Sequence, residues 1–317
     1  MIDPIQVWRN WRSRLELIAS WGLAPTDVVL EVGSGQNPSP RADVLCERYV
    51  ADGTERHDAL PRVDRPLVVG DLARLPFADG AFDFVICTHV LEHVADPGGA
   101  LAELARVAPR GYVETPSAAW ERMHSFPFHR WYVSDEGGTM VFRAKERPIH
   151  DAGAKEWLEG LCRGRPGLMD WIFQHERELG VIVGFVWEGR QPARVEGTPA
   201  PETAPGFSGA AEASRAEEVE VLRRAEIAGR RAQSLADGLY RLTSRRLRRA
   251  STPRVEVERA LVCPRCGGAL RAEAAPALVT GGSEALDPGG SEALVCAEGH
   301  RHDGVRAGER VIPFLLP

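Results

Sequence analysis

The chain has 317 residues, more than the roughly 100 to 200 of a typical single domain, so we expect two domains. Its apolar share of 44% and charged share of 26% are those of a soluble, packed protein. A formal net charge of −6 disfavours a protein that coats nucleic acid nonspecifically. No stretch resembles a signal peptide or reaches the roughly 18 uncharged apolar residues of a membrane span, so we expect a cytoplasmic protein.

Short apolar runs alternate with helical patterns in the N-terminal part of the chain. An amphipathic helix is predicted over 5–21, where apolar residues recur at steps of three and four. Buried strands are predicted, in chain order, at 27–32, 48–51, 67–70, 82–87, 111–114 and 181–188. A further helix is expected at 97–107. This alternation predicts an α/β fold with a mostly parallel sheet, helices on both faces and a ligand site at the carboxyl ends of the strands.

Changes in composition divide the chain into three parts. We expect a first domain at 1–195, which contains an insertion at 117–178 rich in Trp and His. A stretch rich in Pro, Ala and Gly from 191 onward opens a linker with a long charged helix, at 196–255. A small C-terminal module is expected at 256–317.

A glycine-rich turn, Gly33-Ser34-Gly35, follows the first predicted strand. Such a turn lets the backbone approach a ligand closely, and the next helix N-terminus offers free N–H groups to it. The third glycine of a dinucleotide-binding turn is missing and Pro38 follows, so a dinucleotide enzyme is disfavoured. Asp52, about 20 positions further on, fits a ribose-binding role.

Three segments, in order along the chain, resemble successive motifs of class I S-adenosylmethionine (SAM) dependent methyltransferases of the Leu-Glu-His type. They are Val29-Leu30-Glu31-Val32-Gly33-Ser34-Gly35, the stretch from Asp71-Leu72 to Phe82-Asp83, and Val90-Leu91-Glu92-His93-Val94. The resemblance implies a Rossmann-like, seven-stranded methyltransferase sheet, SAM as the cofactor and methyl transfer as the reaction.

The resemblance also implies a cofactor site at the strand ends. Its residues would be Glu31, Gly33, Ser34, Gly35, Asp52, Gly53, Asp71, Leu72, Thr88 and His89. The glycine turn would hold the methionine part of SAM, and Asp52 would accept hydrogen bonds from the ribose hydroxyls. Asp71 with the Leu72 backbone would contact the adenine. Thr88 and His89 would line the sulfonium region.

Three histidines are candidates for a general base. Methyl transfer is an in-line displacement that chiefly needs alignment and exclusion of water, and a base is needed only where the acceptor loses a proton. His93, His124 and His129 titrate in a suitable range, and each also fits a structural role. The insertion, with its aromatic run at 126–132, is expected to cap the pocket of a small-molecule or glycan acceptor.

Four metal-ligand residues form two pairs in the C-terminal module. Cys263 and Cys266 have C-x2-C spacing, and Cys296 and His300 have C-x3-H spacing. Such a set suits a closed, structural, tetrahedral Zn²⁺ site, with His302 as an alternative to His300. A module of this size with few large apolar residues needs a metal to fold. The segment is similar to the zinc ribbons of the Trm112-like group, small proteins that partner methyltransferases, which implies a protein partner for the ribbon.

Two other functions stay open. Five arginines within 241–249 could contact phosphates, and together with the ribbon they favour an RNA methyltransferase, although a solvated helix end explains them equally. A non-catalytic SAM-binding scaffold is the second alternative, and the intact glycine turn and acids oppose it. The aromatic insertion and the acidic net charge favour the small-molecule or glycan acceptor.

Overall fold

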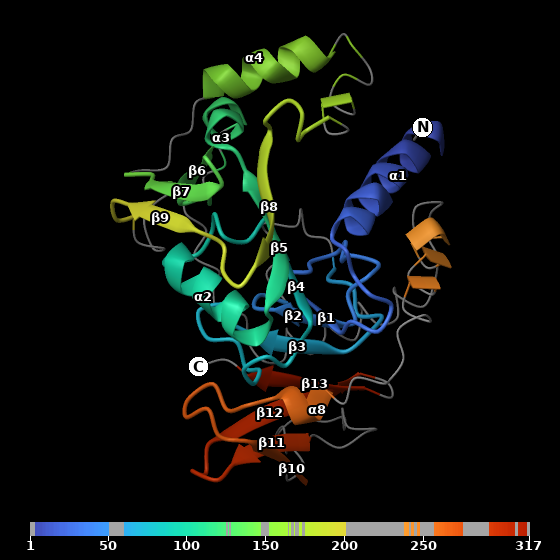
Figure 1. Cartoon of the computed structure of the whole chain (residues 1–317), viewed down its shortest axis with the longest axis vertical. Coiled ribbons are helices and arrows are strands. Elements are labelled where there is room, and N and C mark those ends of the chain that lie inside the picture. The colour runs from blue at the N-terminus through green and yellow to red at the C-terminus, as the bar shows by residue number, and fades with distance from the viewer. Residues whose placement is uncertain are drawn as a thin grey trace, which may run out of the picture.

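The structure of the chain is a computed structural model, shown in Figure 1. Its described residues are 4–50, 60–124, 126, 128–146, 152–163, 165, 168, 171–172, 175–200, 238–240, 242–243, 246–247, 257–274, 292–307 and 310–315. A sheet runs through the molecule with helices on both of its faces, so the predicted α/β fold is confirmed.

The first domain contributes six strands to this sheet, in the order β3-β2-β1-β4-β5-β8. They are β1 (Val29–Val32), β2 (Val44–Glu47), β3 (Leu67–Gly70), β4 (Phe84–Thr88), β5 (Arg110–Pro116) and β8 (Ile182–Glu188). The first five are parallel, and β8 is antiparallel to β5. Every residue of β1, β2 and β3 is buried, as expected for short apolar strands covered on both faces. The carboxyl ends of the parallel strands meet at one edge of the sheet.

Two helices cover the two faces. α1 (Pro4–Ser20) leads into Trp21, whose ring stacks on Tyr112 of β5 at a centroid distance of 5.1 Å. α2 (Pro97–Val107) buries its apolar stripe against the opposite face, and the Asp96 side chain caps its first turn. Among the described helices, none has both the length and the apolar character needed to span a membrane.

The second strand lies earlier than predicted. We expected it at 48–51, but β2 spans Val44–Glu47. Burial is the reason: all four residues of β2 are covered, whereas the next side chain, Arg48, is exposed and reaches the carboxylate of Asp71. The acid that ends the strand is therefore Glu47.

Two strands of the insertion and one strand that follows β8 form a second, small sheet that the sequence did not predict. Its strands are β6 (Trp131–Glu136), β7 (Thr139–Ala144) and β9 (Ala193–Glu196), in the order β6-β7-β9. β9 lies in the Pro-, Ala- and Gly-rich stretch that we expected to open a linker. It forms a strand there because its residues pair in parallel with β7. The helices α3 (Ala118–His124) and α4 (Ala152–Arg163) belong to the same insertion.

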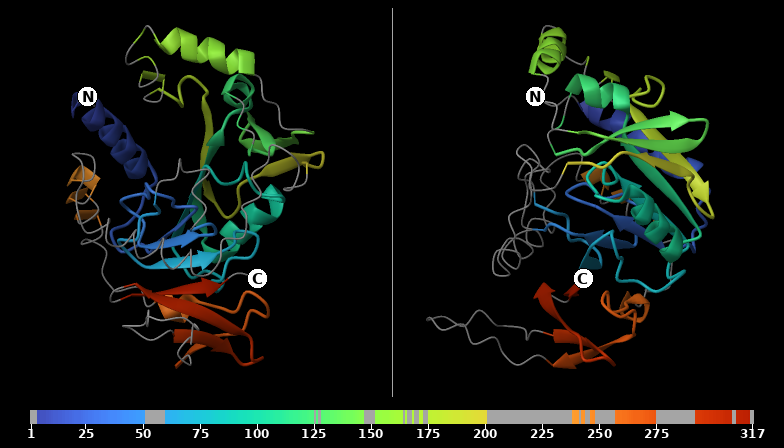
Figure 2. Two further views of the ribbon diagram at one scale, coloured as in Figure 1. Left: turned by 180° about the vertical axis from the view of Figure 1, so that it is seen from behind. Right: turned by 90° about the vertical axis from the view of Figure 1, so that its left-hand side faces the viewer.

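The C-terminal module extends the central sheet (Figures 1 and 2). It contains α8 (Val257–Ala260), β10 (Leu270–Ala274), β11 (Glu292–Cys296), β12 (Arg301–Ala307) and β13 (Arg310–Leu315). β13 pairs in parallel with β3, and β12, β11 and β10 follow as antiparallel neighbours. The predicted seven-stranded sheet is therefore replaced, in the described part of the chain, by a ten-stranded one. The difference arises because the module adds its strands to the β3 edge.

Backbone bonds and a shared core fix the module to the first domain. Ala78 N donates to Ala260 O at 2.8 Å, and Val262 N donates to Pro76 O at 3.0 Å. Leu261, which lies between these bonds, is 4% exposed and belongs to the core cluster of the central strands and α2. The two parts therefore have one continuous hydrophobic core.

Replacing Leu261 by Ala tests this shared core. We expect the free energy of unfolding to fall by about 2–4 kcal/mol, because truncating a buried Leu leaves a cavity. Tryptophan fluorescence during urea unfolding is the measurement. All eight tryptophans precede residue 188, so the signal reports the unfolding of the part before the C-terminal module. Leu242→Ala is the control: Leu242 is 59% exposed, and its loss should change stability by less than about 0.5 kcal/mol. An unchanged midpoint for Leu261→Ala would mean that the two parts unfold independently.

Candidate functional site

The turn after β1 requires glycine at its first position. Gly33 has a φ of +71°, and its N–H donates to Cys46 O at 2.9 Å. A Cβ at Gly33 would stand only 2.1 Å from Val90 Cγ2, which lies in the segment after β4. Gly35 also has a positive φ, of +51°, and Ser34 between them is buried. The backbone of the predicted methionine-binding turn is thus packed tightly against the segment that follows β4.

Glu31 lies buried behind this turn. Its Oε2 accepts a hydrogen bond from Ser39 N at 2.6 Å, which fixes the loop that follows the turn. Burial raises the pKa of Glu31 to about 7, although the nearby Arg14 favours the charged form. Glu31 therefore positions the loop through its hydrogen bond with Ser39 N.

Glu47 ends β2 beside the turn. Its Oε2 accepts a hydrogen bond from Gly35 N at 2.7 Å. The predicted ribose residues, Asp52 and Gly53, lie outside the described residues. Sequence reasoning missed Glu47 because it placed the strand at 48–51. The apolar run just before this acid, residues 44–46, was the signal that could have located it.

Asp71 follows β3, as predicted. Its Oδ1 accepts a hydrogen bond from Ala73 N at 2.8 Å, and its Oδ2 lies 3.2 Å from Arg48 Nε. Leu72 beside it is 4% exposed. The carboxylate is thus held at the same edge of the sheet as the glycine turn and Glu47.

Thr88 closes β4, and His89 follows it with a φ of +56°. Positive φ is uncommon for residues other than glycine and gathers at functional sites. His89 Nε2 lies 3.2 Å from Glu114 Oε1, and its Nδ1 lies 3.6 Å from Glu92 Oε1. Although burial favours the neutral ring, these two carboxylates raise the pKa of His89 to about 10. Half of the ring is exposed, so solvent screens part of this attraction.

Two of the predicted histidines meet Glu92 in a buried cluster. Glu92 is 1% exposed, and its Oε1 lies 3.9 Å from His93 Nε2 and 4.0 Å from His129 Nε2. The structure thus brings together His93, from the turn after β4, and His129, from the loop before β6. The side chain of His124 lies outside the described residues.

Glu121 and Lys145 hold His129 from behind. His129 Nδ1 lies 2.6 Å from Glu121 Oε2, and the other oxygen of Glu121 accepts from Lys145 Nζ and, at 2.9 Å, from Phe126 N. Burial, assisted by the neighbouring His93, lowers the pKa of His129 well below its ordinary value. The surroundings of His129 therefore disfavour the charged form of its ring.

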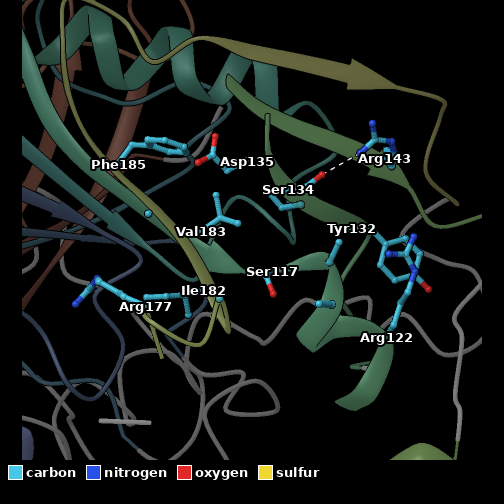
Figure 3. A pocket seen from close by; sticks show the side chains of 15 residues that line it. Ser117, Arg122, Tyr132, Ser134, Asp135, Arg143, Arg177, Ile182, Val183 and Phe185 are labelled. Atoms are coloured by element: carbon cyan, nitrogen blue, oxygen red, sulfur yellow. Dashed lines mark hydrogen bonds between the residues drawn. The ribbon is translucent and has the colours of Figure 1, made fainter. Parts of the chain in front are cut away.

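A cavity of about 620 Å³ lies between β8 and the insertion (Figure 3). Charged, polar and apolar side chains line it together, among them Arg122, Tyr132, Asp135, Arg143, Arg177, Val183 and Phe185. None of the residues predicted to bind SAM is part of this lining. Arg177 links the cavity to the strand ends, because its guanidinium donates to Glu114 Oε2 at 2.5 Å and Glu114 faces His89.

The four predicted zinc ligands come together in the C-terminal module. The ligand atoms of Cys263, Cys266, Cys296 and His300 all lie within 4.8 Å of one another. Cys296 Sγ is 3.6 Å from Cys266 Sγ and 3.5 Å from His300 Nδ1. His302 reaches the same group, with its Nε2 3.3 Å from Cys263 Sγ. Three sulfur atoms and an imidazole nitrogen at these separations fit the donor set of tetrahedral zinc.

Comparisons with known proteins cover the strand ends just described. Residues 30–113 match a protein family described as a methyltransferase domain. A demethylmenaquinone methyltransferase of Renibacterium salmoninarum is 36% identical over 114 residues, 34% of this chain and 48% of that protein. One of Beutenbergia cavernae is 32% identical over 138 residues, 38% of this chain and 53% of that protein. The chain spans about half the length of the curated relatives it matches.

Solved structures of methyltransferases also align with the chain. A complex between the Haloferax volcanii Trm112 methyltransferase activator and a protein named as a methyltransferase aligns with a TM-score of 0.34 and 14% identity. This alignment covers 61% of this chain and 99% of that one. The family match spans the glycine turn, the ends of β2, β3 and β4, and most of β5. Residues 30–113 of this chain are therefore similar to a methyltransferase domain.

Proposed function

We propose that the chain binds SAM across the ends of β1 to β4 and transfers its methyl group to a small-molecule acceptor. The observation that carries the proposal is the convergence of three groups at one edge of the sheet: the Gly33 turn, the Glu47 carboxylate and the Asp71 carboxylate. A tight glycine turn admits a ligand close to the backbone, and carboxylates accept hydrogen bonds from ribose and adenine.

Each part of SAM has a partner in this arrangement. The turn from Gly33 to Gly35 contacts the methionine part, and Glu47 accepts from the ribose hydroxyls in the role first expected of Asp52. Asp71 with Leu72 contacts the adenine. The methyl group then lies near the end of β4, at Thr88 and His89. The main task of the protein there is to hold the acceptor in line with the methyl–sulfur bond.

The acceptor side of the proposal rests on the cavity beside β8. Its volume of about 620 Å³ is that of a site for a small organic ligand. The mixed lining suits a molecule with both apolar and polar parts, a description that a quinol or a glycan satisfies. Two relatives are named for a small-molecule acceptor, demethylmenaquinone. The RNA alternative depends on the arginines within 241–249, most of which lie outside the described residues.

The C-terminal module, on this proposal, is a structural zinc ribbon. Cys263, Cys266, Cys296 and His300 supply the ligands. The ion would replace the large apolar core that the module lacks, and the ribbon would hold β13 against β3.

Gly33→Ala tests the cofactor site. We expect SAM affinity, measured by calorimetry, to fall at least about tenfold, because the new Cβ meets Val90 and the positive φ becomes strained. Gly80→Ala is the matched control: Gly80 also has a positive φ, of +61°, but a Cβ there meets nothing within 4 Å. It should bind SAM as the wild type does. Equal SAM affinities for the wild type and Gly33→Ala would refute the assigned cofactor site.

Methyl-labelled SAM identifies the acceptor class. The wild-type chain is incubated with labelled SAM and a cell extract, which is then separated into small molecules, glycans, RNA and protein. We expect label in the small-molecule fraction, and less label with Gly33→Ala when SAM is below saturation. Label in RNA that disappears steeply with rising salt would instead support the RNA alternative.

Cys296→Ser tests the zinc ribbon. We expect zinc affinity at this site to fall by at least roughly tenfold, because one of four ligands is lost. The cobalt-substituted variant should also show a weaker absorption band from thiolate-to-cobalt charge transfer, because one of three thiolates is gone. Cys162→Ser is the control, since Cys162 is a free thiol outside the cluster and should keep the band. A full band in Cys296→Ser would remove Cys296 from the ligand set.

A further inference from the structure

Glu92 is a buried acid that accepts no hydrogen bond from the described residues. It is 1% exposed, and both of its carboxylate oxygens are shielded from solvent. A buried carboxylate is stable where donors, a cation or a proton compensates its charge. The groups nearest to its Oε1 are ring nitrogens of His89, His93 and His129, at 3.6, 3.9 and 4.0 Å. These separations are too long for direct hydrogen bonds.

Glu121 fixes the orientation of the His129 ring beside Glu92. His129 Nδ1 lies 2.6 Å from Glu121 Oε2, and the other oxygen of Glu121 accepts from Lys145 Nζ and Phe126 N. The second ring nitrogen, Nε2, lies 4.0 Å from Glu92 Oε1. That separation is too long for a hydrogen bond, and a metal ion between the two atoms would contact both.

We propose that Glu92, His93 and His129 bind a divalent first-row transition-metal ion. Their ligand atoms all lie within 4.8 Å of one another. Metal bonds of about 2.0–2.2 Å place neighbouring ligand atoms roughly 3.0–3.6 Å apart, so small side-chain movements close the site. Two imidazoles and one carboxylate suit Fe²⁺, Co²⁺ or Zn²⁺ and leave coordination positions open.

The outer contacts of the cluster match those of metal-binding histidines. Such histidines usually donate their second ring nitrogen to a carboxylate, which fixes the tautomer and the ring orientation. Glu121 is the carboxylate beside the second ring nitrogen of His129, and Lys145 compensates the charge of Glu121. His93 is held by ring packing, stacked on Phe128 at 5.6 Å with an interplanar angle of 10°. The site is thus preorganised by its surroundings.

The position of the cluster connects it to the acceptor, a step that rests on the proposed function. Val90, which packs on the Gly33 turn, precedes Glu92 by two residues, and Glu92 O accepts from Arg130 N at 2.8 Å. The cluster therefore lies between the cofactor turn and the insertion. A metal ion there would bind and polarise an oxygen of the acceptor, so the substrate class is a small molecule that is methylated at or beside a hydroxyl group. His93 and His129 then serve as ligands rather than as the general base first considered.

A protonated His89 is the competing partner for Glu92. It would compensate the carboxylate across 3.6 Å without any metal, while its other nitrogen stays near Glu114. The two arrangements differ in the number of metal ions that the chain binds. That number can be counted without an assay of activity.

Cobalt binding to the full chain decides between them. The chain is stripped with a chelator, reconstituted with Co²⁺ and desalted, and cobalt is counted by mass spectrometry. We expect two ions per chain: one in the ribbon, with thiolate charge-transfer absorption, and one at Glu92, with only weak visible bands. Glu92→Gln should bind one ion and keep the thiolate band, whereas Cys296→Ser should weaken the thiolate band and keep the ion at Glu92. One ion in the wild type, or two in Glu92→Gln, would overturn the proposal.

Three controls complete the design. Glu103→Gln changes a carboxylate that bonds Arg106, away from the cluster, and should keep both ions. Glu121→Gln should weaken the second ion by about 10- to 100-fold, because it disturbs the orientation of His129. Tryptophan fluorescence checks that each variant is folded. Calorimetry with SAM separates the two hypotheses: SAM binding with a single cobalt ion refutes only the metal site, and two ions without SAM binding refute only the proposed function.

Discussion

The register of the parallel strands determines the geometry of the edge where their carboxyl ends meet. Val32 of β1 pairs with Cys46 on one side and with Cys87 on the other, so the residues that follow them, Gly33, Glu47 and Thr88, lie at the same level of the sheet. That is how two bonds form between the turn and β2: Gly33 N donates to Cys46 O, and Gly35 N donates to Glu47 Oε2. A shift of one residue in any strand would turn its side chains to the opposite face. The arrangement of the turn and the two carboxylates therefore depends more on backbone pairing than on any single side chain.

Buried charge is concentrated beside this edge, and most of it is compensated by partners within the chain. Burial opposes the ionisation of Glu114, but His89 and Arg177 lower its pKa to about 2. Glu121 has Lys145 and a backbone N–H. Only strong compensation lets acids stay ionised in a core, and such groups rarely stabilise a fold better than apolar packing would. Their concentration at one place is therefore better explained by function than by stability.

Local patterns in the sequence predicted the parts of the fold that are held together locally. The helix at 97–107 and the strand at 67–70 have their predicted bounds, because a capped helix and a buried apolar run are marked by adjacent residues. The cysteine pairs were found by spacing for the same reason. β9 was missed because its pairing with β7 bridges about 50 residues. Glu92 was read within its motif, yet its relation to His129 depends on how the insertion folds back, which no spacing records.

The β3 edge explains why the C-terminal module and the preceding strands form one structure. Without β13, β3 would be an open edge strand, buried on both faces and ready to pair with another chain. β13 covers that edge, with Leu315 opposite Gly70, immediately before Asp71. Whatever orders the module therefore also orders the end of β3. The proposed ribbon metal would thus act, through backbone pairing, on the adenine side of the proposed cofactor site. A partner protein is not needed for this effect, because the chain supplies the covering strand itself.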